Sequence, residues 1–380
     1  MEHHKAKILL YTDTHRTGGA ENHMLSLAKF LDNKKFWVGV ACSKHASLDN
    51  WCKKIQDAGI PVFRLNVKHK HDPRHFFGLR KIIRNEHIDL LHIHAWNPAS
   101  GRYGFLAALS QKLQHLVTEH DPFALPPFKN WLKKKLMKNI QAVIAVSEEN
   151  RNLLISLYPH LEQKIHAIHN GIDTTWFESQ LLSFSRSDRE EYKKDIFETD
   201  ESTPIIIAVA ELHPRKGLVY LLDAARILAE KKKKFKIIIV GDGHQRKELE
   251  NFIENVKLEP YVELLGKRSD IPYLLKASDV FVLPSMHEAF GLVLLEAMMA
   301  ELPVIATSRG GVPEIITHGE SGILIEPRNS QAIANAIENL IDDPEMAKKI
   351  SKAGQKRARE KFDLKRMVEE TEDLYSKILS

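Results

Sequence analysis

The chain has 380 residues, of which 43% are hydrophobic and 28% are charged, as in soluble globular proteins. This length exceeds one ordinary hydrophobic core and predicts two domains of roughly 150–200 residues each. No apolar run approaches the roughly 18 residues of a membrane span, and the N-terminus leads directly into a strand-like stretch, so we expect neither a span nor a signal peptide. The two cysteines, Cys42 and Cys52, have no CxxC or metal-ligand spacing, which favours a reduced, cytoplasmic protein.

The charge is uneven along the chain. Residues 1–180 contain 25 Lys and Arg against 16 Asp and Glu, a net charge of +9, whereas residues 181–380 contain 30 against 34, a net charge of −4. The basic first half indicates an anionic partner, such as a phosphorylated glycan, an anionic lipid surface or nucleic acid. Sixteen of the 20 histidines also lie before residue 181. Their spacing shows no metal-site pattern, so we expect surface or packing roles for most of them.

Short aliphatic runs alternate with helix-like segments in both halves of the chain. Many of these runs are apolar on both faces, which predicts parallel sheets covered by helices on both sides. The repeated alternation indicates two doubly wound, Rossmann-like α/β domains, which we place at residues 1–172 and 173–362. The predicted strands are 7–13, 37–43, 61–67, 89–95, 115–121, 142–147 and 164–170 in the first half, and 204–212, 236–243, 262–266, 279–285, 303–308 and 322–327 in the second.

Two segments lie outside this alternation. Residues 179–203 are polar and charged, and we interpret them as a linker that contains a short helix. Residues 363–380 have apolar side chains at helical spacing and predict a terminal helix, which can dock back on the first domain.

The first of four notable loops contains Gly18 and Gly19, ahead of a helix that we predict from Asn22 to Leu31. Parallel sheets bind ligands at the carboxyl ends of their strands, and two glycines at a helix start let backbone N–H groups approach a phosphate. The sequence is neither GxGxxG nor a Walker loop, so a simple tight turn is the alternative.

Two loops of the second half carry charged residues. In residues 210–217, Arg215 and Lys216 can neutralise a diphosphate, or they form an ordinary surface pair. In residues 284–297, Glu288 precedes a helix predicted to start around Phe290, and Glu296 lies about two turns along it. Carboxylates accept hydrogen bonds from sugar hydroxyls, but an acid in so apolar a helix is costly without a partner. A salt bridge to the neighbouring domain is the alternative for these acids.

The fourth loop contains His120, at the end of the fifth predicted strand, and residues 170–173 (Asn-Gly-Ile-Asp) look like a turn at the domain junction. Either feature can be purely structural. No DxD motif occurs in the chain, so paired carboxylates on a divalent ion are not expected. We therefore expect no metal or other cofactor in the reaction, with basic residues and helix N-termini stabilising a leaving diphosphate.

Taken together, these features resemble glycosyltransferase family 4, the large retaining family with the GT-B fold. The match rests on the Gly-Gly-Ala-Glu of residues 18–21, His120, the turn at 170–173, the Arg-Lys-Gly of 215–217, and two glutamates, Glu288 and Glu296, with seven residues between them. Their order and intervals match along nearly the whole chain. The resemblance implies two Rossmann-like domains facing a central cleft, with the helix 363–380 crossing back to the first domain.

The resemblance also implies a set of donor contacts. The amide of Gly19, next to Gly18, would contact the distal phosphate, and Lys216, assisted by Arg215, would neutralise the diphosphate. Glu296 would hold the ribose hydroxyls, and backbone near Arg268 would border the base.

For the sugar, the resemblance implies that Glu288 and the amides after it would hold its hydroxyls, and that His120 would contact it near the reacting carbon. The residues involved after Glu288 are Ala289, Phe290 and Gly291. One position departs from the family: an Arg is common five residues before Lys216, and Glu211 stands there instead. Arg215 can substitute for that Arg.

The implied function is a retaining, metal-independent hexosyltransferase that moves a sugar from a nucleotide sugar to a glycan, a lipid-linked glycan or a small hydroxyl acceptor. Family frequency favours uracil as the base of the donor. Residues 128–138, which mix aromatic and basic side chains, predict a peripheral contact with the inner face of a membrane, or simply an amphipathic helix over the sheet. A nucleotide-sugar 2-epimerase and an inactive sugar-nucleotide-binding protein stay open as alternatives. A nicotinamide oxidoreductase is disfavoured because no GxGxxG follows a strand, and a nucleic-acid binder because no reader motif occurs.

Overall fold

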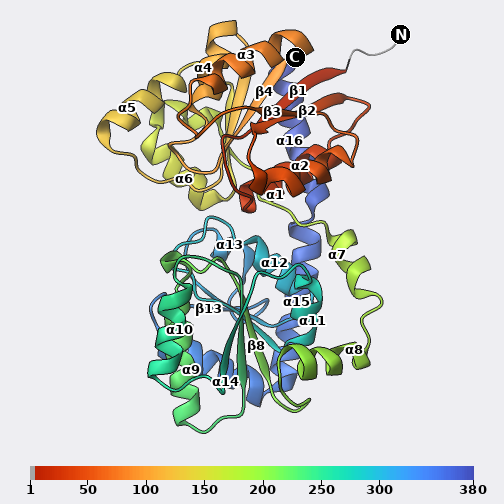
Figure 1. Cartoon of the computed structure of the whole chain (residues 1–380), viewed down its shortest axis with the longest axis vertical. Coiled ribbons are helices and arrows are strands. Elements are labelled where there is room, and N and C mark those ends of the chain that lie inside the picture. Colours follow the sequence, from red (N-terminus) through yellow and green to blue (C-terminus); the bar gives the residue numbers. More distant parts are fainter. Residues whose placement is uncertain (1–4) are drawn as a thin grey trace. The chain divides into compact units, whose positions relative to one another are not determined.

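A computed structural model of the protein describes residues 5–380, which form two compact units. The first unit contains the chain up to residue 171 together with residues 364–380, and the second contains residues 172–363. Each unit is a parallel sheet with helices on both faces (Figure 1). The predicted pair of doubly wound α/β domains is therefore confirmed, and no described helix is long and apolar enough to cross a membrane.

The sheet of the first unit has seven parallel strands in the order β3-β2-β1-β4-β5-β6-β7. Alternate residues of β1 enter different cores: Ile8 and Leu10 pack on one face, and Leu9 and Tyr11 pack on the other. Because both faces are covered, the strands are apolar throughout, which is the pattern that the sequence shows. The strands are β1 (Ala6–Tyr11), β2 (Phe36–Ser43), β3 (Val62–Leu65), β4 (Leu90–Ala95), β5 (Gln114–Glu119), β6 (Ala142–Ala145) and β7 (Ile165–Ala167).

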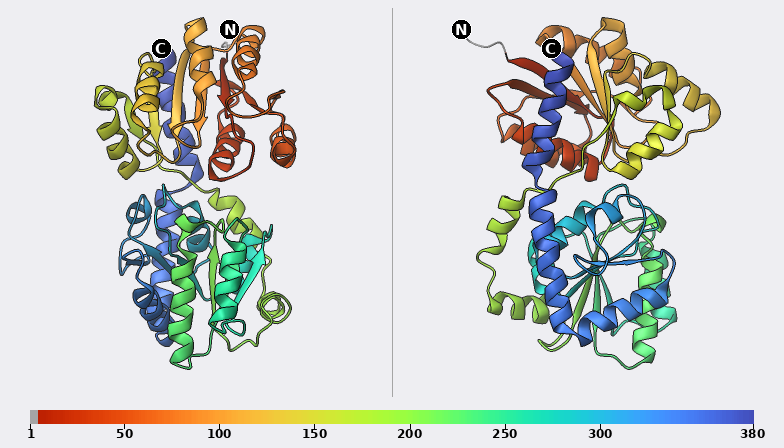
Figure 2. Two further views of the ribbon diagram at one scale, coloured as in Figure 1. Left: turned by 60° about the vertical axis from the view of Figure 1, so that its left-hand side comes forward. Right: turned by 180° about the vertical axis from the view of Figure 1, so that it is seen from behind.

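The helices of the first unit divide between these two faces. One face is covered by α1 (Gly19–Phe30), α2 (Asp49–Gln56) and the terminal α16 (Leu364–Leu379), and the other by α3 (Arg74–Glu86), α4 (Arg102–Gln111), α5 (Pro127–Leu136) and α6 (Glu148–Leu157). The helix α16 runs along the sheet of this unit, as the resemblance implied (Figure 2), and its Tyr375 is fully buried.

The second unit has six parallel strands in the order β10-β9-β8-β11-β12-β13. In both sheets the first strand lies in the interior, and the chain switches to its other side once. Ligands of such sheets bind at this switch, beyond the carboxyl ends of the strands. The strands are β8 (Ile205–Val209), β9 (Lys236–Val240), β10 (Val262–Gly266), β11 (Val280–Leu283), β12 (Val304–Thr307) and β13 (Ile323–Ile325).

The helices of the second unit include those of the segment expected to be a linker. Residues 179–203 contain the end of α7, then α8 and a π-helical turn, Tyr192–Ile196, and they all belong to this unit. The helices are α7 (Thr174–Leu181), α8 (Arg186–Glu191), α9 (Leu218–Glu230), α10 (Arg246–Asn255), α11 (Ile271–Ala277), α12 (Leu292–Met299), α13 (Val312–Ile315), α14 (Ser330–Asp342) and α15 (Pro344–Lys361).

Two expected helix starts were wrong by a few residues. The helix α12 begins at Leu292 and not near Phe290, because Gly291 has a positive φ of 100° that an α-helix cannot contain. The helix α1 begins at Gly19 and not at Asn22, because Gly18 is extended and serves as its N-cap. Both glycines named in the first loop therefore belong to the start of α1.

Candidate functional site

The loops after β8 and β11 lie against each other at the switch point of the second sheet. Gly217 closes the first loop with a φ of 62°, and a Cβ there would lie 2.1 Å from the carbonyl oxygen of Pro284, in the second. The amide of Met286 donates to the carbonyl of Arg215 at 2.7 Å. Only glycine permits this close approach, so the Lys-Gly pair fixes where Lys216 lies relative to the loop that carries Glu288.

Lys216 and Glu288 form an ion pair between these two loops. The Nζ of Lys216 lies 2.6 Å from Oε2 of Glu288, and the side chains are only 18% and 14% exposed. The hydroxyl of Ser285 donates to the same carboxylate oxygen at 3.2 Å. A partly desolvated pair of this kind is held together by charge but still borders solvent, so a ligand that brings its own anion and hydroxyls can exchange with both partners.

The backbone of Glu288 is fixed from a third loop, the one after β12. Gly310 has a φ of 63°, and a Cβ there would lie 1.7 Å from the carbonyl oxygen of Glu288. The same oxygen accepts a hydrogen bond from the amide of Gly311 at 3.1 Å. The glutamate is therefore held by its main chain, and its carboxylate can change partners without a change in the loop.

The helix α12 starts directly after the loop that carries Glu288. Phe290 is buried and packs edge to face on Phe362, with ring centroids 5.8 Å apart, so the segment Ala289–Gly291 is anchored beside Glu288. Helix N-termini favour negative charge. One and a half turns along, Glu296 is largely buried among apolar residues, which raises the pKa of its carboxyl to about 7. No side-chain hydrogen bond or ion pair of Glu296 occurs among the described residues of the second unit.

Three further charged residues of the second unit lie in loops that the sequence analysis places near the donor. Arg215 and Glu211 are both exposed on the loop after β8. Arg268 follows β10, at the edge of the sheet, and its guanidinium donates to both oxygens of Asp270, at 2.9 and 2.7 Å. Lys216, Glu288 and the start of α12 are thus brought together by direct contacts, whereas Arg268 lies two strands away from β8 and pairs locally.

In the first unit, Gly18 and Gly19 are exposed at the N-terminus of α1, and nothing lies within 4 Å of where a Cβ of Gly19 would be. Two acids nearby are buried, and the sequence analysis assigns neither of them a role, although Glu21 belongs to the Gly-Gly-Ala-Glu motif. Asp13, after β1, accepts hydrogen bonds from the Trp96 indole at 3.1 Å and the Gly101 amide at 2.8 Å, and burial raises its pKa to about 6. Burial raises the pKa of Glu21 to about 7. The sequence signals for these acids are the position of Asp13 directly after β1 and the place of Glu21 in the Gly-Gly-Ala-Glu motif, in the first turn of α1.

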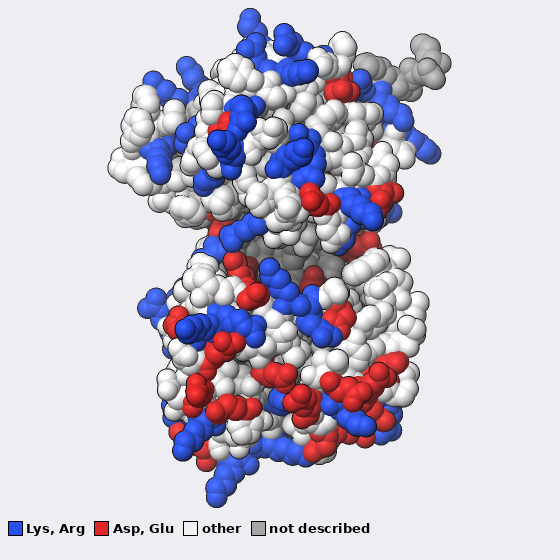
Figure 3. Space-filling view, in the orientation of Figure 1, with Lys and Arg blue, Asp and Glu red and all other residues white. Residues whose placement is uncertain are grey.

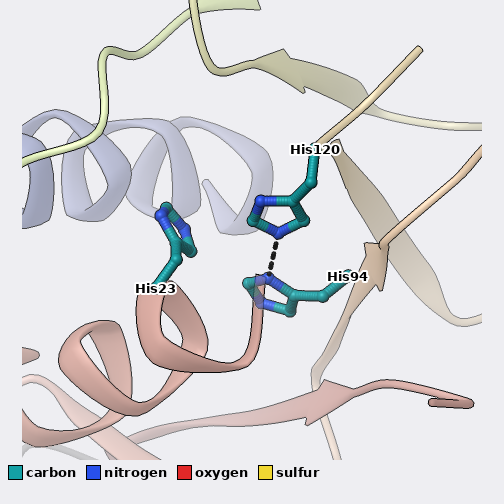
Figure 4. Close-up of side chains that lie close together, drawn as sticks. All are labelled: His23, His94 and His120. Atoms are coloured by element: carbon teal, nitrogen blue, oxygen red, sulfur yellow. Dashed lines mark hydrogen bonds between the residues drawn. The ribbon is translucent and has the colours of Figure 1, made fainter. Parts of the chain in front are cut away.

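His120 belongs to a cluster of three buried histidines that come from α1, the end of β4 and the loop after β5 (Figure 4). His94 and His120 share a hydrogen bond of 3.3 Å between Nδ1 and Nε2, and the ring centroid of His23 lies 4.9 Å from that of His120. One ring nitrogen of each residue lies within 4.8 Å of those of the other two. The sequence spacing of these histidines shows no metal-site pattern, because the parallel sheet brings together positions that are far apart in sequence.

The surroundings of the three rings are well defined. Nδ1 of His23 forms a hydrogen bond of 2.9 Å with Oδ1 of Asn170, so the turn at residues 170–173 has a structural partner in α1. Nε2 of His94 is buried without a partner in the described part of the chain. Burial lowers the pKa of His23 to about 4 and holds the pKa values of His94 and His120 well below the usual range, so all three rings are neutral at pH 7.

Comparisons with known proteins match both halves of the chain. Residues 17–176 match the family model described as Glycosyltransferase Family 4, and residues 188–357 match the model described as Glycosyl transferases group 1. The putative glycosyltransferase EpsD of Bacillus subtilis is 33% identical over 313 residues, which cover 78% of this chain and 79% of that protein.

Two further relatives are similar over almost the full length. The UDP-Gal:alpha-D-GlcNAc-diphosphoundecaprenol alpha-1,3-galactosyltransferase of Escherichia coli is 26% identical, over 98% of this chain and 97% of its own. The crystal structure of Anabaena HepE in complex with UDP and glucose matches with a TM-score of 0.83 and 25% identity, over 98% of this chain and 100% of that one. The chain therefore belongs to glycosyltransferase family 4, and it is a glycosyltransferase of the GT-B type that uses nucleotide sugars.

Proposed function

We propose that this glycosyltransferase moves a hexose from a UDP-sugar to a hydroxyl of a glycan or lipid-linked glycan, without a catalytic metal and with retention of the anomeric configuration. The ion pair between Lys216 and Glu288 at the switch point of the second sheet carries the proposal. It supplies one cation for a diphosphate and one carboxylate for sugar hydroxyls, 2.6 Å apart. The E. coli relative named for a UDP-Gal donor, and the HepE structure with UDP and glucose, support the choice of donor.

The donor would separate the two partners of this pair. Lys216 would turn to the diphosphate, with Arg215 and the helix N-terminus of α12 assisting, because cations and helix dipoles stabilise the charge that develops on the leaving group. Glu288 would keep its backbone position and accept hydrogen bonds from the sugar, with Ala289, Phe290 and Gly291 supplying amides. Glu296 would accept from the ribose hydroxyls.

The remaining contacts follow from the family resemblance. Gly19, next to Gly18 at the start of α1, would donate its amide to the distal phosphate, and backbone near Arg268 would border the uracil. His120 would contact the sugar near the reacting carbon. In the transfer step the acceptor oxygen forms a bond to the anomeric carbon on the face from which the phosphate oxygen leaves. That phosphate oxygen takes the acceptor proton, so neither Glu288 nor Glu296 serves as a nucleophile.

The proposal is tested by donor binding followed by product analysis. A thermal-shift panel of UDP-, GDP- and ADP-sugars should show stabilisation by a UDP-sugar. Mass spectrometry of reactions with a mixed acceptor extract should then show a product heavier by one hexose, and NMR should show that its anomeric configuration equals that of the donor. A new sugar from donor alone would indicate the 2-epimerase, and binding without transfer to any acceptor would indicate the inactive binding protein. An inverted anomer would refute retention.

We propose further that α5 and its flanks contact an anionic membrane surface where the acceptor is found. Phe128 and Trp131 are 72% and 51% exposed, and their rings stack at 6.0 Å. The Nζ of Lys135 lies 4.1 Å from the ring centroid of Trp131. Exposed aromatics with lysines beside them suit the boundary between lipid headgroups and acyl chains. Lys133, in contrast, points inward and pairs with Glu119, so it contributes nothing to this surface.

The charge pattern supports this proposal. On the face shown in Figure 3, Lys and Arg are frequent over the first unit and acidic residues are sparse, whereas the second unit mixes both signs. Sedimentation with anionic vesicles at low salt should pull down the protein, and replacing Phe128 and Trp131 by serine should weaken this binding. Absence of binding to anionic vesicles at low salt would exclude the membrane contact and leave α5 as an ordinary amphipathic helix.

A further inference from the structure

The cluster of His23, His94 and His120 has the chemistry of a transition-metal site. Neutral imidazole nitrogens are good ligands for late first-row divalent ions, and three histidines with an open fourth position are a common arrangement around zinc. Each of the three side chains is at most 8% exposed, so water competes poorly for their lone pairs. They reach one point from three separate elements, which holds them in place before any ion arrives.

The distances favour the same conclusion. Two nitrogens that share a tetrahedral zinc ion at about 2.05 Å lie about 3.3 Å apart, which is the 3.3 Å found between Nδ1 of His94 and Nε2 of His120. The largest separation within the set is at most 4.8 Å, so the third ring would close onto the ion with a movement of about 1 Å.

The hydrogen-bond partners of the rings distinguish this cluster from ordinary buried histidines. His23 interacts through Nδ1 with Oδ1 of Asn170, the kind of outer contact that orients a metal-bound imidazole and leaves its other nitrogen available. The only side-chain hydrogen bond of His94 in the described part of the chain goes through Nδ1 to His120, so no group outside the cluster competes for that nitrogen. The adjacent His92 is different, because Tyr375 and Thr118 occupy both of its nitrogens, at 2.5 and 2.7 Å.

We propose that His23, His94 and His120 bind a late first-row divalent ion such as Zn²⁺. The bound ion would inhibit sugar transfer, because an imidazole of His120 that coordinates the ion cannot contact the sugar. The binding site stands on the geometry of the three residues alone. Only the inhibition rests on the proposed role of His120 beside the sugar. The ion is not a cofactor of the transfer step, so a metal-free preparation should be the active one.

The test uses the full chain, freed of metal by chelation and titrated with Co²⁺ as a spectroscopic probe and with Zn²⁺ in competition. Wild-type protein should bind one ion with visible d–d absorption. The variants His23→Asn and His94→Asn keep an amide donor near the position of Nδ1 but lose the imidazole, and each should lower Zn²⁺ affinity at least about tenfold. His115→Asn is the matched control: His115 is also buried and interacts through Nδ1 with the carbonyl of Leu113 at 3.0 Å, but it lies outside the cluster.

These readouts need no sugar donor, so they remain informative if the proposed transfer reaction fails. Thermal unfolding of each variant shows whether it is folded. Equal affinities in wild type, both cluster variants and the control would overturn the proposal, as would a wild-type protein that binds no ion. If ions bind at the cluster but added Zn²⁺ leaves the transfer rate unchanged, the inhibition is refuted and the site stands.

Discussion

Glu296 provides a quantitative test of the donor site through pH. Burial raises the pKa of its carboxyl to about 7, so the group is mostly protonated at pH 6 and mostly ionised at pH 8. Hydroxyl donors of a bound ribose favour the ionised form and would return the pKa towards its ordinary value of 4.5. Donor binding therefore has to remove the proton of Glu296 at pH 6 but not at pH 8. The affinity for UDP-glucose should rise about tenfold between these pH values, which is a change of about 1.4 kcal/mol in binding free energy.

The assay is calorimetric titration with UDP-glucose at several pH values, because this donor has no group of its own that titrates in the range. Glu296→Gln should bind more weakly at pH 8 and lose most of the pH dependence, since an amide does not ionise. Asp13 and Glu21, with pKa values of about 6 and about 7, are retained in this variant, so the difference between the two proteins isolates Glu296. An unchanged slope in the variant would refute the assignment of Glu296 to the nucleotide.

The same pKa makes a prediction in the absence of donor. A carboxyl whose pKa is raised in the folded state binds its proton more tightly there than in the unfolded chain, so its contribution to stability falls as pH rises from about 4.5 to about 7. Wild-type and Glu296→Gln proteins should therefore diverge in unfolding free energy on going from pH 5 to pH 8, with the variant the more stable by up to about 3 kcal/mol. Parallel urea curves at both pH values would show that the carboxyl is not desolvated.

Two further predictions concern the framework of the site and of α5. Gly310→Ala should lower the unfolding free energy by more than about 3 kcal/mol, because a Cβ at φ 63° would lie 1.7 Å from the carbonyl oxygen of Glu288. The control Gly319→Ala, also at positive φ but in open space, should lower it by about 1 kcal/mol. Equal losses of the two variants in urea unfolding would contradict the close contact. Lys133→Met should lower the unfolding free energy by about 3–5 kcal/mol, because it leaves the buried carboxylate of Glu119 unpaired. Adding Glu119→Gln should recover much of this loss in urea unfolding. An unchanged loss in the double variant would mean that lost packing of the Lys133 side chain dominates.

The strands of both units were predictable because their signal is local. Runs such as Ile205–Val209 are apolar on both faces, and a parallel sheet covered on both sides is the arrangement that buries them. The start of α12 was misplaced because it depends on the backbone conformation of Gly291, and sequence alone gives no φ. A glycine at the end of a loop indicates that a helix starts nearby, but the sequence does not show whether the helix includes the glycine or begins after it.

Contacts between distant positions could not be predicted in the same way. The spacing of Glu288 and Glu296 indicated a family, but the ion pair to Lys216 depends on two loops that meet only in the folded sheet. The histidine cluster joins residues 23, 94 and 120, and no sequence spacing connects them. The burial of Asp13 and Glu21 was not predicted, because an acid near a glycine pair looks like an ordinary turn residue.

The most direct test of the donor site is the transfer rate of two single variants, Lys216→Ala and Glu288→Ala, measured with the donor that the thermal-shift panel selects. Both should lose transfer almost completely while keeping a cooperative thermal unfolding transition, because one removes the cation for the diphosphate and the other the acceptor for the sugar. Arg226→Ala, on the exposed side of α9 and paired with Asp223, is the control and should keep its activity. Near-normal turnover in either site variant would contradict the assignment of that residue to the donor.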